Sequence, residues 1–319
     1  MSLAIKIKNR TAWVIRKTKK QSKRVYDHFF GVEGKNAQTN ILPDPIYLKK
    51  LYKAKMGKDL DLNHPRSFNE KLQWMKLYDR NPLYTTLADK YTAKKYIASI
   101  IGDKYIIPTI AVFDNPEEID FSTLPNQFVL KTTHDSGGVI VCKDKKCFDY
   151  DKAKTFLQQR LNQNYYRTSR EWPYKKIRPR IIAEEYIQSD SIYGITDYKY
   201  FCFNGEPKLL YISIGLDNHP TAKISFYDLL GNEMPFHRSD YEPYHNASMP
   251  DKSKELIELS HRIATHIGSP FVRVDFYAER GKIYFSEITF FPCAGFLPFD
   301  PEEWDLKLGE WITLSQKIE

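Results

Sequence analysis

Four residues near the carboxyl end of the chain have types and a spacing that suit a metal site. Arg273 and Asp275 are two residues apart in an apolar, strand-like stretch, so their side chains point to the same face. Glu287 and Thr289 share a face of the next such stretch, and a turn at 280–281 would bring Asp275 opposite Glu287 or close to it. Two neighbouring carboxylates repel each other unless a cation lies between them, and Mg²⁺ is bound in this way. The alternative is an ordinary sheet that carries two acids on a wet face.

A second group follows a predicted strand at 127–131, which ends in Lys131. The next seven residues are Thr-Thr-His-Asp-Ser-Gly-Gly, and a further strand begins at Val139. A lysine ammonium and the backbone N–H groups of a small-residue turn can hold phosphate oxygens. The residues of this turn are Ser136, Gly137 and Gly138, with His134 as a further candidate donor. The segment is neither a Walker loop nor a G-x-G-x-x-G motif, and an ordinary hairpin turn with a backbone-tied histidine is the alternative.

Two weaker signals complete the set. Glu184 and Glu185 lie in a predicted strand at 181–187, where a carboxylate and backbone groups could meet an adenine edge. Lys90 follows Asp89 in a predicted helix, a place where lysine is ordinarily exposed to solvent. Each signal alone is weak, whereas their order along the chain is informative. The order is Lys90, Lys131 with its turn, Glu184, Lys199, Asp275 and Glu287.

The elements that position these residues are expected to be helical at first and mostly strands afterwards. Apolar spacing and capping signals predict helices at 41–52, 68–78, 82–101, 149–163 and 252–267. Asp44 is the expected N-cap of the first helix, Ser67 and Glu70 form a capping-box signature, and Asn204-Gly205 marks a hairpin. Strands are predicted at 105–108, 110–113, 127–131, 139–142, 181–187, 197–203, 208–213, 222–226, 271–277 and 282–288. The regular βαβ alternation of a doubly wound fold is missing, so we expect an α+β protein with antiparallel hairpins.

The net charge of +8 is concentrated at the amino-terminal end. Residues 1–24 contain nine Lys/Arg and no acid, which leaves a net charge of about −1 for the rest of the chain. This argues against nucleic acid as a partner, because a nucleic-acid-binding body spreads its basic residues over a folded face. Residues 1–24 are expected either to lie as an amphipathic helix on an anionic membrane surface or to form a solvated basic arm.

Other features narrow the class of protein. No apolar run approaches the roughly 20 residues that cross a bilayer, and 1–24 lacks the continuous apolar stretch of a signal peptide. The four cysteines form no C-x-x-C pair, and neither they nor the eight histidines have a zinc-binding spacing. We therefore expect a cytoplasmic protein with free thiols, located at the inner face of the membrane if the basic arm binds there.

The order of these residues, and the wording of several motifs, resemble the ATP-grasp superfamily and within it the TupA-like family, named for teichuronic acid synthesis. The resemblance runs from about Asn40 to the carboxyl terminus. The motifs that carry it are Phe68-Asn-Glu-Lys-Leu-Gln-Trp74, Tyr78-Asp-Arg-Asn-Pro-Leu-Tyr84, Ala88-Asp-Lys-Tyr91, Gln127-Phe-Val-Leu-Lys131, Arg273-Val-Asp-Phe-Tyr277, Phe285-Ser-Glu-Ile-Thr-Phe290, Pro301-Glu-Glu-Trp-Asp305 and Leu308-Gly-Glu-Trp311. The resemblance implies an α+β ATP-grasp fold. Two subdomains, 105–190 and 191–319, would enclose the nucleotide after a basic arm at 1–40 and a helical region at 41–104.

The resemblance also implies a role for each candidate residue. The groups that would hold the phosphates of ATP are Lys90, Lys131, Lys199 and a mobile loop at 132–138. The groups that would contact adenine and ribose are Glu184, Glu185, Ile187 and Asp190. The groups that would bind one or two Mg²⁺ are Asp275, Glu287 and Thr289. Arg273 would face the developing acyl phosphate.

Two residues depart from the usual family pattern. Thr289 stands where many members have Asn, which is a better metal ligand. Asp135 stands in a loop that often reads Asn-His-Gly-Ser-Gly in this branch. Its negative charge would weaken ATP binding unless the carboxylate points away from the phosphates or pairs with a cation.

The activity implied by the resemblance is that of an ATP- and Mg²⁺-dependent carboxylate-amine ligase, which forms an amide through an acyl phosphate. The substrates would be small molecules or glycans of surface polysaccharide synthesis (capsule, O-antigen or teichuronic acid), such as a uronic acid and an amino acid. Three alternatives are open. They are a sugar kinase on the same scaffold, a glycosyltransferase with a D-x-D motif at Asp59-Leu-Asp61, and a nucleotide-binding protein without turnover.

Overall fold

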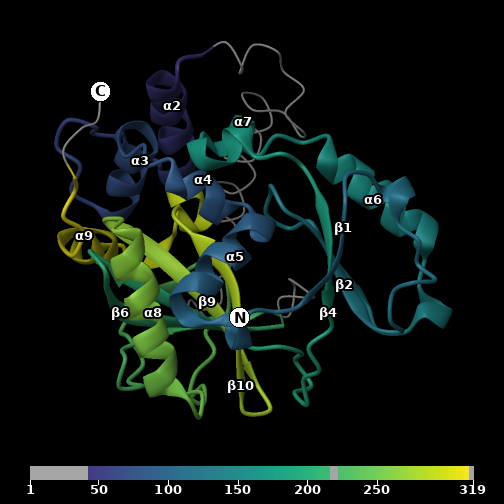
Figure 1. Cartoon of the computed structure of the whole chain (residues 1–319). Coiled ribbons are helices and arrows are strands. Elements are labelled where there is room, and N and C mark those ends of the chain that lie inside the picture. Colours follow the sequence, from purple (N-terminus) through teal and green to yellow (C-terminus); the bar gives the residue numbers. More distant parts are fainter. Residues whose placement is uncertain (1–41, 216–221, 316–319) are drawn as a thin grey trace, which may run out of the picture.

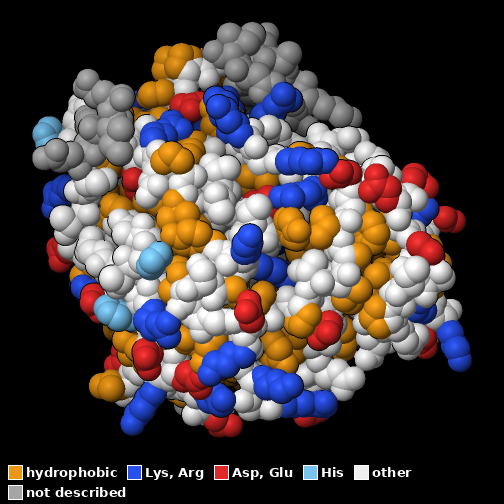
Figure 2. All heavy atoms as spheres, viewed as in Figure 1, with side chains coloured by type: hydrophobic (Ala, Val, Ile, Leu, Met, Phe, Trp, Pro, Cys, Tyr) orange, Lys and Arg blue, Asp and Glu red, His pale blue; other side chains and the backbone are white. Residues whose placement is uncertain are grey.

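The computed structural model describes residues 42–215 and 222–315. They form a helical amino-terminal region and two main antiparallel sheets with helices packed against them (Figure 1). The basic arm predicted at 1–40 lies outside the described residues. Within the described ranges, no helix is long and apolar enough to cross a membrane. On the face shown in Figure 2, Lys and Arg side chains are interspersed with Asp and Glu.

The helical region is close to the one that the sequence predicts. Its helices are α2 (Asp44–Met56), α3 (Phe68–Tyr78), α4 (Leu83–Ala88) and α5 (Lys90–Ile101). The capping box at the start of α3 is confirmed, because the Ser67 hydroxyl accepts the Glu70 N–H and the Glu70 carboxylate accepts the Ser67 N–H. The N-cap of α2 was predicted wrongly. Pro43 takes that position, and the Asp44 carboxylate instead accepts the hydroxyl of Tyr166 at 2.6 Å.

A single helix over 82–101 was also predicted wrongly, because the chain breaks at Asp89. This residue has an extended backbone (φ −79°, ψ 113°), and its carboxylate caps α5 by accepting the Tyr91 N–H. The same carboxylate pairs with Arg180 at 2.7 Å. That partner is distant in sequence, so the helical spacing alone gave no sign of the break. As a result Lys90 becomes the first residue of α5, with its N–H donated to the Thr133 carbonyl.

The first sheet has four strands, and all its neighbours are antiparallel. Their order is β1 (Thr109–Phe113), β4 (Ile181–Glu185), β2 (Phe128–Thr132) and β3 (Val139–Cys142). One face packs against α6 (Tyr150–Leu161) through Phe128 and Leu157, which are both fully buried. Lys131 and Glu184 alternate with the residues of this apolar face, so their side chains lie on the opposite one.

The second sheet has five antiparallel strands. Their order is β10 (Lys282–Thr289), β9 (Phe271–Glu279), β5 (Asp197–Phe203), β6 (Glu206–Ile214) and β7 (Lys223–Tyr227). The helix α8 (Ser253–Ile267) packs against β5, β6 and β9 (Figure 1). The two predicted hairpin turns are confirmed, since Asn204-Gly205 and Arg280-Gly281 have the positive φ values that tight turns require. Beside this sheet, the short strands β8 (His237–Arg238) and β11 (Phe299–Asp300) form a separate pair, followed by α9 (Glu303–Glu310).

The predicted strand at 105–108 is wrong. Asp103–Tyr105 forms a 3-10 turn, and Ile106 makes an isolated parallel bridge with Phe285 of β10. Pro108 has no N–H to offer a ladder, although its carbonyl accepts the N–H of Glu185 in β4. The segment therefore contacts the edge strand β10 of one sheet and the inner strand β4 of the other, and it forms no strand of its own.

Candidate active site

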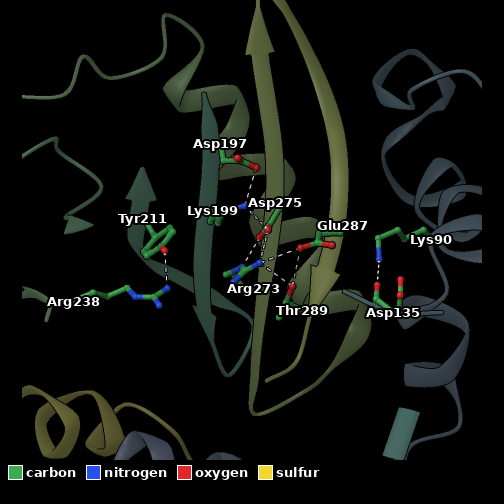
Figure 3. A network of polar contacts seen from close by, with 10 residues as sticks. All are labelled: Lys90, Asp135, Asp197, Lys199, Tyr211, Arg238, Arg273, Asp275, Glu287 and Thr289. Carbon is green, nitrogen blue, oxygen red and sulfur yellow. Dashed lines mark hydrogen bonds and ion pairs between the residues drawn. The ribbon is translucent and has the colours of Figure 1, made fainter. Parts of the chain in front are cut away.

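Four polar side chains form a row across the five-stranded sheet. In the strand register, Lys199 of β5 lies opposite Tyr211 of β6 on one side and opposite Asp275 of β9 on the other. Asp275 in turn lies opposite Glu287 of β10, as the sequence predicts for this hairpin. Directly opposite residues share a face of a sheet. The row therefore places two acids, a lysine and a tyrosine side by side (Figure 3).

Arg273 joins the two acids of the row. Its Nε lies 2.7 Å from Asp275 Oδ1, and its Nη2 lies 2.6 Å from Asp275 Oδ2. The same Nη2 lies 3.2 Å from Glu287 Oε1 and 3.0 Å from Thr289 Oγ1. Arg273 thus contacts each of the other three residues predicted from the 273–289 hairpin. In this structure the cation between the two carboxylates is a guanidinium.

Lys199 completes the neutralisation of Asp275, which is fully buried. Its Nζ lies 3.0 Å from Asp275 Oδ2 and 2.8 Å from Asp197 Oδ1. Burial opposes the charge of the ammonium, but the two carboxylates raise the pKa of Lys199 above its ordinary value. Lys199 is therefore a buried, charged ammonium, and both oxygens of Asp275 already accept hydrogen bonds.

Glu287 is the acid of this group with the most access to solvent. Its side chain is 36% exposed, and only its Oε1 is engaged by Arg273 and Thr289 among the described contacts. Burial raises its pKa, whereas the charges of Lys90, Arg273, Lys199 and Lys131 outweigh burial and lower that pKa to about 2. Glu287 is thus an ionised carboxylate that faces several cations.

Of the two acids, Glu287 is better placed than Asp275 to bind Mg²⁺. In the described ranges there is no group of three or more His, Cys, Asp or Glu side chains that could hold a metal. Mg²⁺ in phosphoryl-transfer sites needs only one or two carboxylates, because phosphates and water complete its shell. Glu287 meets this requirement with a hard, ionised oxygen. Asp275 would meet it only after Arg273 or Lys199 moves away.

The four-stranded sheet contributes a second ion cluster. Glu184 of β4 is buried and pairs through Oε2 with Lys131 at 2.7 Å and through Oε1 with Lys94 at 2.5 Å. Burial opposes both charges, but the Glu184 carboxylate raises the pKa of Lys131 above its ordinary value, so Lys131 is held protonated. Lys94 was missed in the sequence. Its spacing of four residues from Lys90 puts both on one face of α5 and was the available signal.

The loop at 132–138 is closed by its own hydrogen bonds. The Thr132 N–H donates to the Gly138 carbonyl at 2.8 Å, and the Lys90 ammonium donates to the Asp135 carbonyl. Beside Lys90, the His134 ring lies 3.2 Å from the Gln163 carbonyl through Nε2, and burial lowers its pKa. Lys90 is therefore at the loop (Figure 3), where the positive charge of its ammonium helps to lower the pKa of Glu287.

The Asp135 carboxylate pairs with a cation, which is one of the two conditions under which its charge would not weaken ATP binding. Its carboxylate is buried and accepts Arg160 Nε at 2.6 Å and the Thr132 hydroxyl at 2.5 Å. Arg160 also donates to the carbonyl of Ser136. Arg160 comes from α6, far along the chain, and no sequence signal indicated it. The negative charge of Asp135 is therefore neutralised by the ion pair with Arg160.

Two of the remaining predicted residues, Glu185 and Ile187, line a pocket of about 230 Å³ between the two sheets. Its walls include the segment 185–188, Pro108, Arg280 and Tyr284. Glu185 is exposed and Ile187 is buried. Asp190 lies on the surface, where it pairs with Arg280 at 2.5 Å. Glu184 lies apart from this pocket, because its carboxylate is committed to Lys94 and Lys131.

A helical region and two antiparallel sheets that bring lysines, an arginine and paired acids to one place define an ATP-grasp protein. The sequence agrees with this class, because residues 70–313 match the sequence model of the family described as TupA-like ATPgrasp. The match covers more than half of the chain, and the chain belongs to this family.

Solved structures with which the chain shares similarity are distant. The D-alanine–D-alanine ligase of Bacillus anthracis complexed with ATP is 15% identical over 64% of this chain and 53% of that chain, with a TM-score of 0.36. An ATP-grasp RimK domain protein of Sphaerobacter thermophilus is 14% identical over 74% of this chain and 70% of that chain, with a TM-score of 0.40. The ATP-grasp ligase PsnB, complexed with Mg and ADP, is 9% identical over 66% of this chain and 52% of that chain, with a TM-score of 0.39. The chain thus spans about half the length of the B. anthracis and PsnB chains. No curated protein matches it.

Proposed function

We propose that the chain is an ATP- and Mg²⁺-dependent ligase that joins a carboxylate to an amine through an acyl phosphate. The observation that carries the proposal is the ionised acid Glu287, which contacts Arg273 at 3.2 Å and lies in the field of three lysines from both sheets and α5. Lys90, Lys131, Lys199 and Arg273 all lower the pKa of Glu287. In a member of the ATP-grasp family, such a cluster has the charge that phosphate oxygens need.

The nucleotide would lie between the two sheets. Its adenine would occupy the pocket at 185–188, and its phosphates would lie under the loop 132–138 against Lys90 and Lys131. In this arrangement Glu184 acts indirectly, because it holds Lys131 in place and keeps it charged. Glu287 would hold Mg²⁺, with Asp275 joining if Arg273 moves toward the substrate. The ion would supply charge neutralisation between the terminal phosphates.

The loop and the metal acids lie in different parts of the chain, and this separation supports a proposal for the domains. Residues 41–104 would form the helical region, 105–190 the lid subdomain with the loop, and 191–319 the subdomain with the metal acids. In the reaction, a substrate carboxylate attacks the terminal phosphate and ADP leaves. The amine then displaces phosphate to give an amide. Arg273 and Lys199 stabilise the negative charge on the transferred group, and the protein needs no nucleophile of its own.

The substrate class rests on the family and on the charge of the chain. The family is named for teichuronic acid synthesis, and we propose that the acid is a sugar uronate and the amine an amino acid or similar compound. The nine basic residues of 1–24, which lie outside the described residues, support work at the anionic inner face of a membrane. The glycosyltransferase alternative has weak support, since Asp59 pairs with exposed Lys53 and Asp61 caps the backbone at Asn63.

Trapping with hydroxylamine separates the proposal from a kinase. The purified chain is incubated with ATP, Mg²⁺, hydroxylamine and a panel of uronic acids and amino acids. A ligase converts the correct acid to its hydroxamate and releases phosphate, because hydroxylamine intercepts the acyl phosphate. A kinase yields a stable phosphoester and no hydroxamate. Hydroxamate-free phosphoester formation, or binding of ATP without turnover across the whole panel, would contradict the ligase.

A further inference from the structure

A strained loop lies next to the proposed site. Cys293 and Ala294, which follow β10, both have left-handed backbone conformations, with φ of 50° and 54°. Such conformations are unfavourable for residues other than glycine and persist where surrounding structure enforces them. Two buried side chains of α3 do so here. Gln73 Nε2 donates to the Gly295 carbonyl at 2.7 Å, and Lys76 Nζ donates to the Ala294 carbonyl at 2.8 Å.

A buried arginine lies on the other side of this loop. Arg238 of β8 holds the Asp240 carboxylate with two hydrogen bonds, of 2.9 and 2.7 Å. Its Nη1 donates to the hydroxyl oxygen of Tyr211 at 2.9 Å. Burial raises the pKa of the Cys293 thiol, and the positive charge of Arg238 acts against this rise. The arginine therefore connects the strained loop to the row of polar residues on the sheet.

Tyr211 is left with a proton to donate. Its oxygen accepts from Arg238, and among the described residues no acceptor takes its O–H. Burial raises the pKa of Tyr211 above its ordinary value, so the group is a neutral hydrogen-bond donor. Tyr211 lies opposite Lys199 and therefore on the face that carries Arg273 and the two acids (Figure 3).

We propose that Tyr211 binds the carboxylate of the acid substrate and that Arg238 is a positioning residue that orients the Tyr211 hydroxyl. The inference rests on the proposed ligase and adds a place for its acid. The carboxylate would lie between the Tyr211 O–H and the Arg273 guanidinium, with the 291–295 loop at its edge. A neutral donor and a guanidinium suit an oxygen that becomes an acyl phosphate, because both stabilise negative charge without adding a competing acid.

Cys293 provides a readout that does not depend on turnover. Among the described cysteines, Cys293 and Cys147 are exposed, so a Cys147→Ser parent leaves Cys293 as the accessible thiol of that set. Alkylation of Cys293 by iodoacetamide is followed by mass spectrometry of the peptide, at pH 8.5 because the surrounding protein raises the pKa of this thiol. Rates are compared with and without D-glucuronate, in the presence of Mg²⁺ and a non-hydrolysable ATP analogue. D-Glucose serves as the uncharged control.

The decisive comparison is between two tyrosine variants of the same parent. Tyr211→Phe removes the proposed donor. Tyr200→Phe removes a hydroxyl that has no partner in the described structure, one residue from Lys199 and on the opposite face of β5. We expect D-glucuronate to slow the alkylation of Cys293 in the parent and in Tyr200→Phe. In Tyr211→Phe, the same protection should require a D-glucuronate concentration at least tenfold higher. Arg238→Lys should fall between them, and nucleotide binding should be equal in all.

Two results would overturn the inference. One is equal protection of Cys293 in Tyr211→Phe and the parent, and the other is no protection of the parent by D-glucuronate. The hydroxylamine assay keeps this outcome separate from the proposed function. Tyr211-dependent protection without any hydroxamate leaves the carboxylate site standing and removes the ligase. Hydroxamate formation with an unchanged KM for the acid substrate in Tyr211→Phe supports the ligase and removes the proposed role of Tyr211.

Discussion

Asp275 and Glu287 lie directly opposite each other on β9 and β10, and one nitrogen of Arg273 lies within 3.2 Å of both carboxylates. The two acids differ in what they have left to offer. Asp275 is fully buried and saturated by Arg273 and Lys199, whereas Glu287 is partly exposed and has one oxygen without a described partner. A metal ion that enters this pair would therefore meet Glu287 first.

Replacing Glu287 should lower the rate of ATP turnover more than it lowers the stability of the fold. We expect Glu287→Gln to lower ATP turnover by about 100-fold, the usual cost of removing one electrostatic group from a transition state, and to raise the Mg²⁺ concentration at half-maximal rate. The same change at Glu258, an exposed residue of α8, is the matched control. Phosphate release as a function of Mg²⁺ gives both quantities. An unchanged Mg²⁺ dependence in Glu287→Gln would place the metal elsewhere.

Glu184 should matter for stability, and its effect should depend on pH. Its carboxylate is buried between Lys131 and Lys94, and breaking such a pair typically costs ~3–5 kcal/mol. Burial raises the pKa of Glu184, but the two lysines outweigh burial and lower it below the ordinary value of 4.5. The unfolded chain therefore binds more protons than the folded one as pH falls below about 4.5. The stability that Glu184 contributes is present above that pH and is lost as pH falls through the folded pKa.

Urea unfolding between pH 3 and pH 7 measures this contribution. The free energy of unfolding should rise more steeply with pH in the parent than in Glu184→Gln. The adjacent exposed Glu185→Gln should keep the parent's slope. If Glu184→Gln shows the parent's slope and midpoint, the two-lysine cluster contributes nothing to folding.

The direction in which Asp135→Asn changes ATP affinity distinguishes two interpretations of this residue. If its charge repelled phosphates, Asp135→Asn would tighten ATP binding. The carboxylate is instead buried and paired with Arg160 and Thr132, so the substitution loosens the loop and leaves Arg160 short of a partner. We expect about tenfold weaker binding, or ~1.4 kcal/mol, in a fluorescent-nucleotide titration. Asp151→Asn, an exposed change in α6, is the control. Tighter binding in Asp135→Asn would refute this reading of the loop.

The two loop glycines should respond differently to alanine. A Cβ on Gly138 would lie 1.7 Å from the Thr132 hydroxyl oxygen and 2.7 Å from an Asp135 oxygen, so the loop has to open. A Cβ on Gly137 meets only Arg160 Nη2, at 3.9 Å, and its φ of 84° adds roughly 1–2 kcal/mol of backbone strain. Gly138→Ala should therefore abolish nucleotide binding and lower Tm, while Gly137→Ala should bind nucleotide with a small loss of Tm. Equal affinities would show that loop closure is not needed.

Local signals allowed much of the fold to be predicted. The capping box at Ser67 and the turns at Asn204-Gly205 and Arg280-Gly281 depend on a few adjacent residues, and each is confirmed. The turn at Arg280 sets the register as far as Phe285 opposite Phe276, and an irregularity between Phe285 and Glu287 then shifts it by one residue. Spacing alone therefore placed Asp275 only near Glu287, and the irregularity brings the two acids directly opposite each other. The break at Asp89 was missed, since its carboxylate both caps α5 through the Tyr91 N–H and pairs with Arg180, which is distant in sequence.

The candidate site shows the same division. Residues of the 273–289 hairpin come from one local unit and were predicted together. Arg160 and Arg238 approach from α6 and β8, and the isolated sequence carries no signal for either contact. Glu184 was assigned to adenine from its place in a strand, and its engagement with Lys94 became visible only with both elements in place. The roles of all these residues toward a nucleotide are predictions.

A crystal structure with a non-hydrolysable ATP analogue and Mg²⁺ tests the central claim most directly. We expect the phosphates beside Lys90 and Lys131 under the loop 132–138, with the metal on Glu287 and the adenine in the pocket at 185–188. Phosphates bound away from these lysines, or a metal that does not contact Glu287, would contradict it.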